Sequence, residues 1–235
     1  GLSAAFNAPL SGVMFTLEEV FKYFSPLILL TCMTSAMVAD MVARIMFGSG
    51  PVFHFQIVGS IELSNYWLLI ILGIILGFFG AFYNWTLLTS QNLMKKIKSP
   101  FLRVLLTFLV VGATGLLFPN IIGSGHRLMD SFSLGMGLAF LCLILIGKYL
   151  ISMVSYASGV PGGIFFPLLV LGASLGAVFA TIVISLFHLP SHLFANLVIL
   201  AMAGTFTAIV RAPMTGILLL VEMTGSFDHL LPLAL

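Results

Sequence analysis

Charged side chains are scarce in this sequence. Asp, Glu, Lys and Arg make up 7% of its 235 residues, against about a quarter in a typical soluble domain. That is too few to cover a soluble surface. The basic cluster Lys95, Lys96 and Lys98 is too small for a nucleic-acid interface, so we expect no nucleic-acid partner. Cys32 and Cys142 both lie in apolar runs, which favours small core residues over a disulfide.

Apolar residues dominate instead, at 60% of the chain with a mean hydropathy of +1.21. A membrane-spanning helix needs about 20 of them in a row. Long runs of this kind lie at 26–48, 66–94, 100–119, 134–157, 163–188 and 193–210, and shorter apolar pieces at 4–20 and 213–224. The sequence therefore predicts an all-α, multi-pass integral membrane protein. The three lysines fall between two spans, and the positive-inside bias predicts that this link is cytoplasmic.

One apolar region is interrupted by the stretch Ser158–Pro167, which reads SGVPGGIFFP. Irregular backbone at membrane depth survives only where protein buries it or where it lines a cavity. A helical pattern resumes near Ile164, and the first amides of such a helix would point into the cavity as an anion site. The alternative is a re-entrant loop that only eases packing, and the segment alone does not separate the two.

In the opening segment 5–20, Asn7 can cap a helix that has Pro9 in its first turn. Near its end Glu18 and Glu19 point about 100° apart, so at most one can share the environment of the apolar side. Either both carboxylates sit at the water interface, or one is drawn inward as a proton acceptor.

Other polar groups inside the spans have simpler interpretations. Asp40 and Arg44 stand at i and i+4, the spacing of a structural ion pair on one helix face. Lys148 lies mid-span and needs a partner, a cavity or a path to the interface, which the sequence does not identify.

Small residues at helical spacing predict close helix packing. Gly73 and Gly77 form one small-xxx-small face. The stretch 172–176 matches the Gly-x-Ser-x-Gly pattern of serine hydrolases, but it lies inside a hydrophobic helix rather than a strand-turn-helix elbow. We therefore interpret it as a packing face and not as the site of an enzyme.

The two ends of the chain share a motif, Ala-Pro-x-[Ser/Thr]-Gly followed by a glutamate nine residues after the proline. Every matching pair has the same offset, 212 − 8 = 204. This predicts that one structural unit occurs twice, an architecture typical of transporters whose substrate site lies where broken helices meet. Sequence identity leaves open whether the repeat is parallel or inverted. The pairs are Ser3-Ala4 with Thr207-Ala208, Ala8-Pro9 with Ala212-Pro213, Gly12 with Gly216, and Glu18 with Glu222.

Three segments together resemble signatures of the CLC family of chloride channels and chloride/proton antiporters: 7–19, 162–167 and 211–224. The resemblance implies an all-helical fold with inverted repeats and broken helices, and a homodimer that contacts through the helices around 8–20 and 212–224. It implies that the backbone amides of Ile164 and Phe165, with Gly162 and Gly163, bind chloride. It also implies that Glu19 matches the internal proton-transfer glutamate of the antiporter branch.

The same resemblance predicts that 1–235 is a partial CLC transmembrane domain. The family's gating-glutamate motif would lie before it and the helix with the pore tyrosine after it, so we expect no transport from this chain alone. Phe166 stands where alanine is common. We expect a chloride/proton antiporter of the plasma (inner) membrane, surrounded by lipid, with no cofactor or metal. The alternative is a passive chloride channel in which Glu19 is a bystander.

Overall fold

The computed structural model describes residues 1–48, 61–119, 121–123, 125, 128–129, 132–160 and 162–225, and these residues are helices joined by short connections. The helices are α1 (Leu2–Phe6), α2 (Pro9–Phe15), the π-helix η1 (Thr16–Phe21), α3 (Pro26–Phe47), the 3₁₀ turn η2 (Leu63–Asn65), α4 (Trp67–Lys95), α5 (Pro100–Leu117), α7 (Leu138–Ala157), α8 (Phe165–Phe187), α9 (Leu193–Val210) and α10 (Pro213–Thr224).

The six predicted spans are confirmed as helices long and apolar enough to cross a membrane. The fourth begins at Leu138 rather than near residue 134, because the glycines at 135 and 137 disfavour helix. Two of these helices are much more buried than the others. In their most apolar stretches, 78% of the residues of α8 and 72% of those of α9 are buried, against 6% for α5. The core of the molecule is therefore the α8–α9 pair, against which α4 and α7 pack.

Small residues allow α8 and α9 to approach closely. A Cβ on Gly172 would lie 2.7 Å from the Cα of Met202, and one on Gly176 would lie 2.6 Å from the Cβ of Ala201. Ser174, between the two glycines, is fully buried and donates its hydroxyl to the Val170 carbonyl at 2.8 Å. The prediction that 172–176 is a packing face is confirmed.

On α4 the close contact is not where the sequence pattern predicted it. Gly73 and Gly77 face outward, and a Cβ on either would meet no described atom within 4 Å. The buried stripe of α4 includes Leu72, Leu76 and Gly80, and a Cβ on Gly80 would lie 2.6 Å from the Cβ of Ala208 on α9. The prediction that Gly73 and Gly77 form a packing face is therefore wrong for the described chain. Each follows a residue of the buried stripe directly, and one residue along a helix is a rotation of about 100°, which turns both glycines away from the neighbouring helix.

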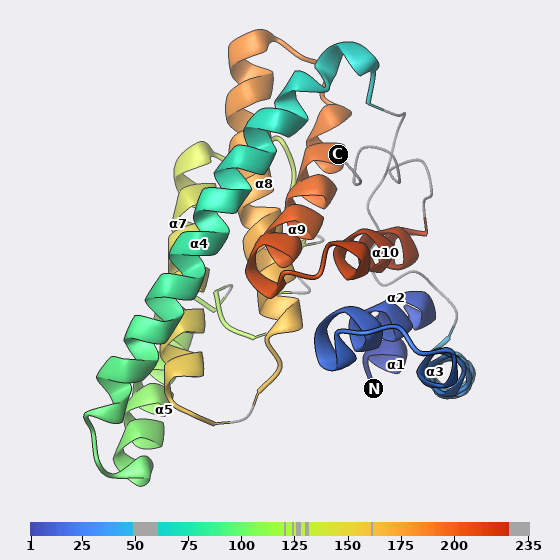
Figure 1. Ribbon diagram of the computed structural model, residues 1–235. Coiled ribbons are helices and arrows are strands. Elements are labelled where there is room, and N and C mark those ends of the chain that lie inside the picture. The colour runs from blue at the N-terminus through green and yellow to red at the C-terminus, as the bar shows by residue number, and fades with distance from the viewer. Residues whose placement is uncertain are drawn as a thin grey trace.

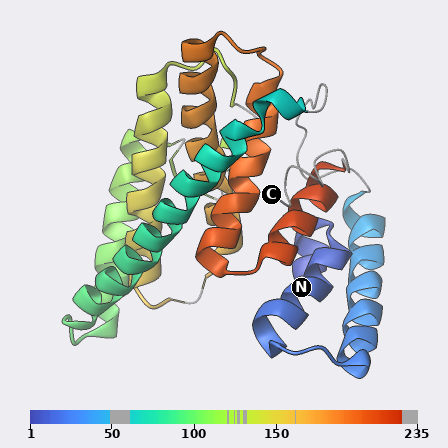
Figure 2. The same cartoon turned by 45° about the horizontal axis from the view of Figure 1, so that its top comes forward.

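The N-terminal helices stand to one side of the α4–α9 bundle, and α10 lies between the two groups (Figures 1 and 2). The helix predicted to hold Pro9 in its first turn is confirmed as α2, but its N-cap is Ala8, and Asn7 instead ends the separate helix α1 in the left-handed conformation (φ 55°). Asn7 is thus not the cap of the helix that contains Pro9. A proline disfavours helical backbone in the residue before it, and asparagine tolerates the left-handed region that the break requires.

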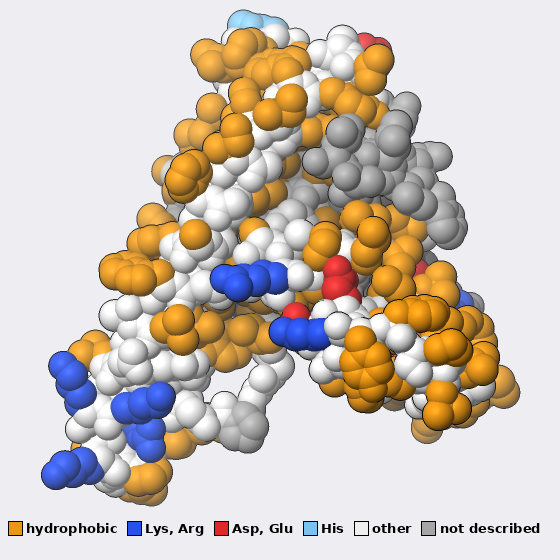
Figure 3. All heavy atoms as spheres, in the orientation of Figure 1, with side chains coloured by type: hydrophobic (Ala, Val, Ile, Leu, Met, Phe, Trp, Pro, Cys, Tyr) orange, Lys and Arg blue, Asp and Glu red, His pale blue; other side chains and the backbone are white. Residues whose placement is uncertain are grey.

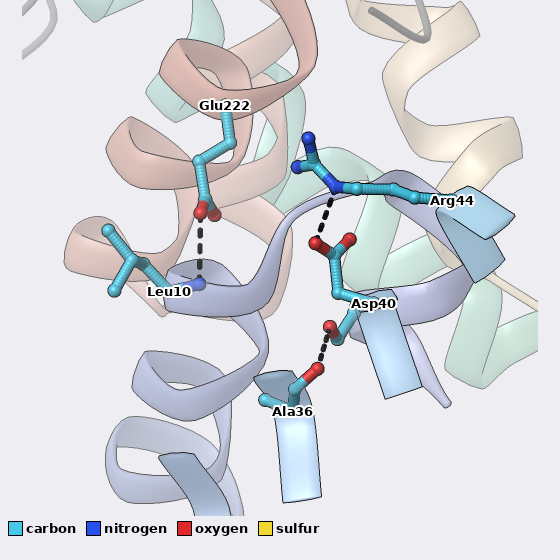
Figure 4. Close-up of polar contacts among 6 residues, drawn as sticks. Leu10, Ala36, Asp40, Arg44 and Glu222 are labelled. Carbon is cyan, nitrogen blue, oxygen red and sulfur yellow. Dashed lines mark hydrogen bonds and ion pairs between the residues drawn. The ribbon is translucent and has the colours of Figure 1, made fainter. Parts of the chain in front are cut away.

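Two of the charged sites inside the spans, the Asp40–Arg44 pair and Lys148, have partners within the chain. The Arg44 Nε donates to Asp40 Oδ2 at 2.6 Å, which confirms the predicted ion pair (Figure 4). Lys148 on α7 is 3% exposed, and its Nζ donates to the carbonyls of Ile121 at 3.1 Å and Gly123 at 2.6 Å. The partners of Lys148 are thus backbone oxygens of the turn after α5, which no side-chain pattern could identify.

The lysines of the α4–α5 link, Lys95, Lys96 and Lys98, are exposed. Basic side chains gather at the lower-left end of the face drawn in Figure 3, which is the end of the molecule where Figure 1 shows the α4–α5 link. Both cysteines are free thiols on helices, Cys32 on α3 and Cys142 on α7, as the sequence predicted.

Candidate functional site at the start of helix α8

The break after α7 is held in an irregular but hydrogen-bonded conformation. Ser158 donates its hydroxyl to the Ser155 carbonyl at 2.6 Å and accepts the Val160 amide at 3.3 Å. The Tyr156 hydroxyl on α7 then donates to the Gly163 carbonyl at 2.7 Å. Helix α7 therefore fixes the backbone that leads into α8.

Helix α8 begins at Phe165, with Ile164 as its N-cap and no side-chain cap. The Leu168 amide donates to the carbonyl of this N-cap residue at 3.2 Å. The amides that come before it have no acceptor within the helix, as at any helix start. Among the described residues no hydrogen bond engages the amides of Ile164 or Phe165. Gly162 and Gly163, just before them, are exposed. The four residues predicted to bind chloride thus lie together at an open helix N-terminus, which favours an anion.

Aromatic rings fix the position of this helix start. The Phe165 ring lies 5.0 Å from that of Phe15 on α2, 6.3 Å from that of Phe6 on α1 and 5.3 Å from that of Phe206 on α9. Phe166 stacks on Phe6, with centroids 6.2 Å apart. Phe15 is the residue directly before η1, so the same cluster joins the start of α8 to the segment that carries the two glutamates.

Glu18 and Glu19 lie on η1 and face different surroundings, as the helical wheel predicted. The Glu19 side chain is 35% exposed, and its Oε1 is 3.7 Å from the Nζ of Lys22. Both glutamates line a cavity of about 940 Å³, together with Asn84 and Arg211. Basic and acidic side chains lie side by side in the middle of the face drawn in Figure 3.

The Glu18 carboxylate binds the N-terminus of α10. It accepts the Met214 amide at 3.2 Å, and the amide and the hydroxyl of Thr215, each at 2.9 Å. The N-cap of α10 is Ala212, which has no side chain that could do so. Glu18 therefore takes the place of the missing cap from another helix.

Glu222, the repeat partner of Glu18, makes the equivalent contacts with the N-terminus of α2. It accepts the amides of Leu10 at 2.9 Å and of Ser11 at 2.8 Å, and also the Ser11 hydroxyl at 2.5 Å (Figure 4 draws the Leu10 contact). Each segment thus places its C-terminal glutamate on the N-terminus of the other, so the two run antiparallel. The repeat is inverted, which the sequence left open.

The fold and the site define a class: a multi-pass membrane protein built on an inverted repeat, with a broken helix whose N-terminus suits an anion. The chain belongs to the voltage-gated chloride channel (CLC) family, whose model matches residues 1–235.

Curated relatives are named H(+)/Cl(−) exchange transporter ClcA. That of Klebsiella pneumoniae subsp. pneumoniae is 35% identical over 99% of this chain and 51% of its own length. That of Vibrio cholerae serotype O1 is 36% identical over 99% of this chain and 52% of its own length. The chain therefore spans about half the length of the curated relatives that it matches.

Solved structures agree on the fold. A slow cyanobacterial Cl−/H+ antiporter superposes with a TM-score of 0.86 at 29% identity, covering 98% of this chain and 55% of its own. A CLC-type fluoride/proton antiporter gives a TM-score of 0.79 at 22% identity over 97% of this chain and 56% of its own, which supports the fold alone.

Proposed function

We propose that the protein to which this sequence belongs exchanges chloride for protons across a membrane. The observation that carries this proposal is the ring contact between Phe15 and Phe165, 5.0 Å apart. It brings an open helix N-terminus and a segment with an accessible carboxylate into one packed unit. The curated relatives named as exchange transporters support it.

In this proposal the start of α8 receives the anion. The amides of Ile164 and Phe165 replace part of the water shell that chloride loses on entering, and the positive end of the α8 dipole adds attraction. Gly162 and Gly163 leave the approach clear, because a Cβ on either would meet no atom of the described residues within 4 Å. The Tyr156 hydroxyl holds the Gly163 carbonyl and so orients these amides.

Glu19 is the proton-transfer group of the proposal. Its carboxylate lines the 940 Å³ cavity, through which water can deliver a proton. The neighbouring Lys22, 67% exposed, has its Nζ 3.7 Å from the Glu19 carboxylate. A carboxylate on an apolar segment of a membrane protein is costly to keep and is a functional group by default.

The test is Glu19→Gln in the full-length protein reconstituted in liposomes. With a chloride gradient imposed, we expect wild-type protein to drive measurable proton movement, and the variant to move chloride with little or no proton movement. Proton movement that stays coupled to chloride in Glu19→Gln would remove Glu19 from this role. A wild-type reversal potential at the chloride equilibrium value, unchanged by a pH gradient, would indicate a passive channel instead.

We further propose that the protein is a homodimer of the plasma (inner) membrane, in contact through the segments around 8–20 and 212–224. Leu10 and Met214 are repeat partners and are 45% and 57% exposed, so the α2–α10 unit presents an apolar surface on both sides. Replacing each with cysteine in the full-length protein should allow cross-linking between subunits. Mass measurements that give a monomer in mild detergent and in lipid would contradict the dimer.

A further inference from the structure

The two halves of the inverted repeat differ at one point beside the glutamates that cap them. Residues 16–21 form the π-helix η1, whereas the equivalent residues 220–225 continue and end α10 as an ordinary α-helix. The residue after Glu18 is Glu19, 35% exposed in its side chain. The residue after Glu222 is Met223, which is fully buried. Both halves of the repeat therefore have a glutamate that caps the other half's helix, but the residue after that glutamate is accessible only in the first half, at Glu19.

A π turn is a rare, locally widened helix that other contacts must maintain, and it often occurs at functional sites. One contact that η1 makes with another helix is that of Glu18, whose carboxylate accepts three hydrogen bonds from Met214 and Thr215 on α10. Bonds to a carboxylate are about twice as strong as those between neutral groups.

We propose that Glu18 is a positioning residue: its cap on the N-terminus of α10 holds the π turn that directs Glu19 into the cavity. The carboxylate of Glu18 is committed to Met214 and Thr215, so it anchors the turn and Glu19 stays accessible beside it. The cap of Glu222 on α2 has the same chemistry but lies on a regular α-helix whose next residue is Met223. This inference rests on Glu19 carrying the proton of the proposed function.

The repeat supplies a matched pair of variants. Glu18→Gln and Glu222→Gln each replace one acceptor oxygen with an NH₂ group that faces N–H donors. Each variant therefore loses a similar number of the hydrogen bonds that cap one helix. In the full-length protein we expect Glu18→Gln to lose part of its proton coupling and to shift the pH profile of proton flux, with chloride flux retained. We expect Glu222→Gln to lower the thermal stability as much but to keep the coupling and the pH profile of the wild type.

A second, milder pair of variants removes a hydroxyl donor from each capped helix instead of changing the glutamate. Thr215→Ala removes the hydroxyl donor to Glu18, and Ser11→Ala removes the one to Glu222. Coupling should fall in Thr215→Ala, recover in Thr215→Ser, and stay unchanged in Ser11→Ala. Equal loss of coupling in both members of a pair, or in neither, would overturn the proposal and leave the caps as structural contacts only.

A measurement without transport separates this inference from the proposed function. In a full-length background in which every native cysteine is replaced, Cys32→Ala and Cys142→Ala included, Glu19→Cys can be labelled with a charged thiol reagent. We expect the labelling rate to fall when Glu18→Gln is added and not when Glu222→Gln is added. An unchanged rate in both refutes the positioning role even where wild-type protein couples protons to chloride. A changed rate together with absent coupling refutes the proposed function alone.

Discussion

Gly172 offers a quantitative test of the packing between α8 and α9. A Cβ at this position would lie 2.7 Å from the Cα of Met202, 2.8 Å from the carbonyl oxygen of Ala201 and 3.0 Å from the Cβ of Thr205. Two of these atoms are backbone and cannot move aside as the end of a flexible side chain could. Gly172→Ala must therefore push the two most buried helices apart or bend them.

The expected magnitude follows from two opposing effects. Replacing a mid-helix glycine with alanine gains about 1 kcal/mol of helix propensity wherever there is room. Inserting a methyl group into a packed core costs roughly 1–3 kcal/mol. Gly77→Ala on α4 is the matched control, because it has the same intrinsic gain and a Cβ there would meet no atom within 4 Å in the part of the chain that the structure describes. The difference between the two variants isolates the packing term, about 1–3 kcal/mol in favour of Gly77→Ala.

The assay is thermal unfolding of the full-length protein in one detergent, followed by the monodisperse fraction that survives heating. The midpoint should rise slightly or stay level in Gly77→Ala and should fall in Gly172→Ala. A Gly172→Ala protein that is as stable as Gly77→Ala would refute the close approach of α8 and α9 at this point.

Two further outcomes follow from polar groups inside the spans. Lys148→Met should lower the free energy of unfolding by roughly 1–3 kcal/mol, because the carbonyls of Ile121 and Gly123 lose their donor; an unchanged thermal midpoint would contradict this. Arg44→Gln should destabilise more than Asp40→Asn, by on the order of 1–3 kcal/mol, because it strands a carboxylate that is 10% exposed whereas the Arg44 side chain is 42% exposed. Equal midpoints for these two variants would show that the ion pair does not neutralise a buried charge.

The spans were predictable because hydrophobic length is a local property. A membrane requires about 20 apolar residues per helix, and the six long runs all became helices. The identity of the buried face was not predictable in the same way. Gly73 and Gly77 form a good packing motif, yet Gly80 makes the contact, because only the neighbouring helix decides which stripe of α4 is covered.

The candidate site was predicted in its parts but not in its connections. The break, Ile164, Phe165 and Glu19 could be located from motifs, but the ring contacts that join α8 to α2 involve residues about 150 positions apart. Long-range contacts of this kind leave no local pattern.

The reciprocal caps, in which Glu18 binds the start of α10 and Glu222 binds the start of α2, could have been predicted from the sequence. Both short helices begin with Ala-Pro, at residues 8–9 and 212–213, and so offer neither a capping side chain nor a first amide. A helix start of this kind inside a membrane must find an acceptor elsewhere. The glutamate at the same place in both repeats was the available candidate.

The reciprocal caps also bear on how the chain is made. The Leu10 amide finds its acceptor on Glu222, 212 residues later, and at about 5–20 residues per second a ribosome needs roughly 10–40 s to produce it. During that interval the start of α2 lacks the acceptor that Glu222 supplies. The later repeat segment therefore completes the earlier one, and the start of α2 is capped only after Glu222 has been made.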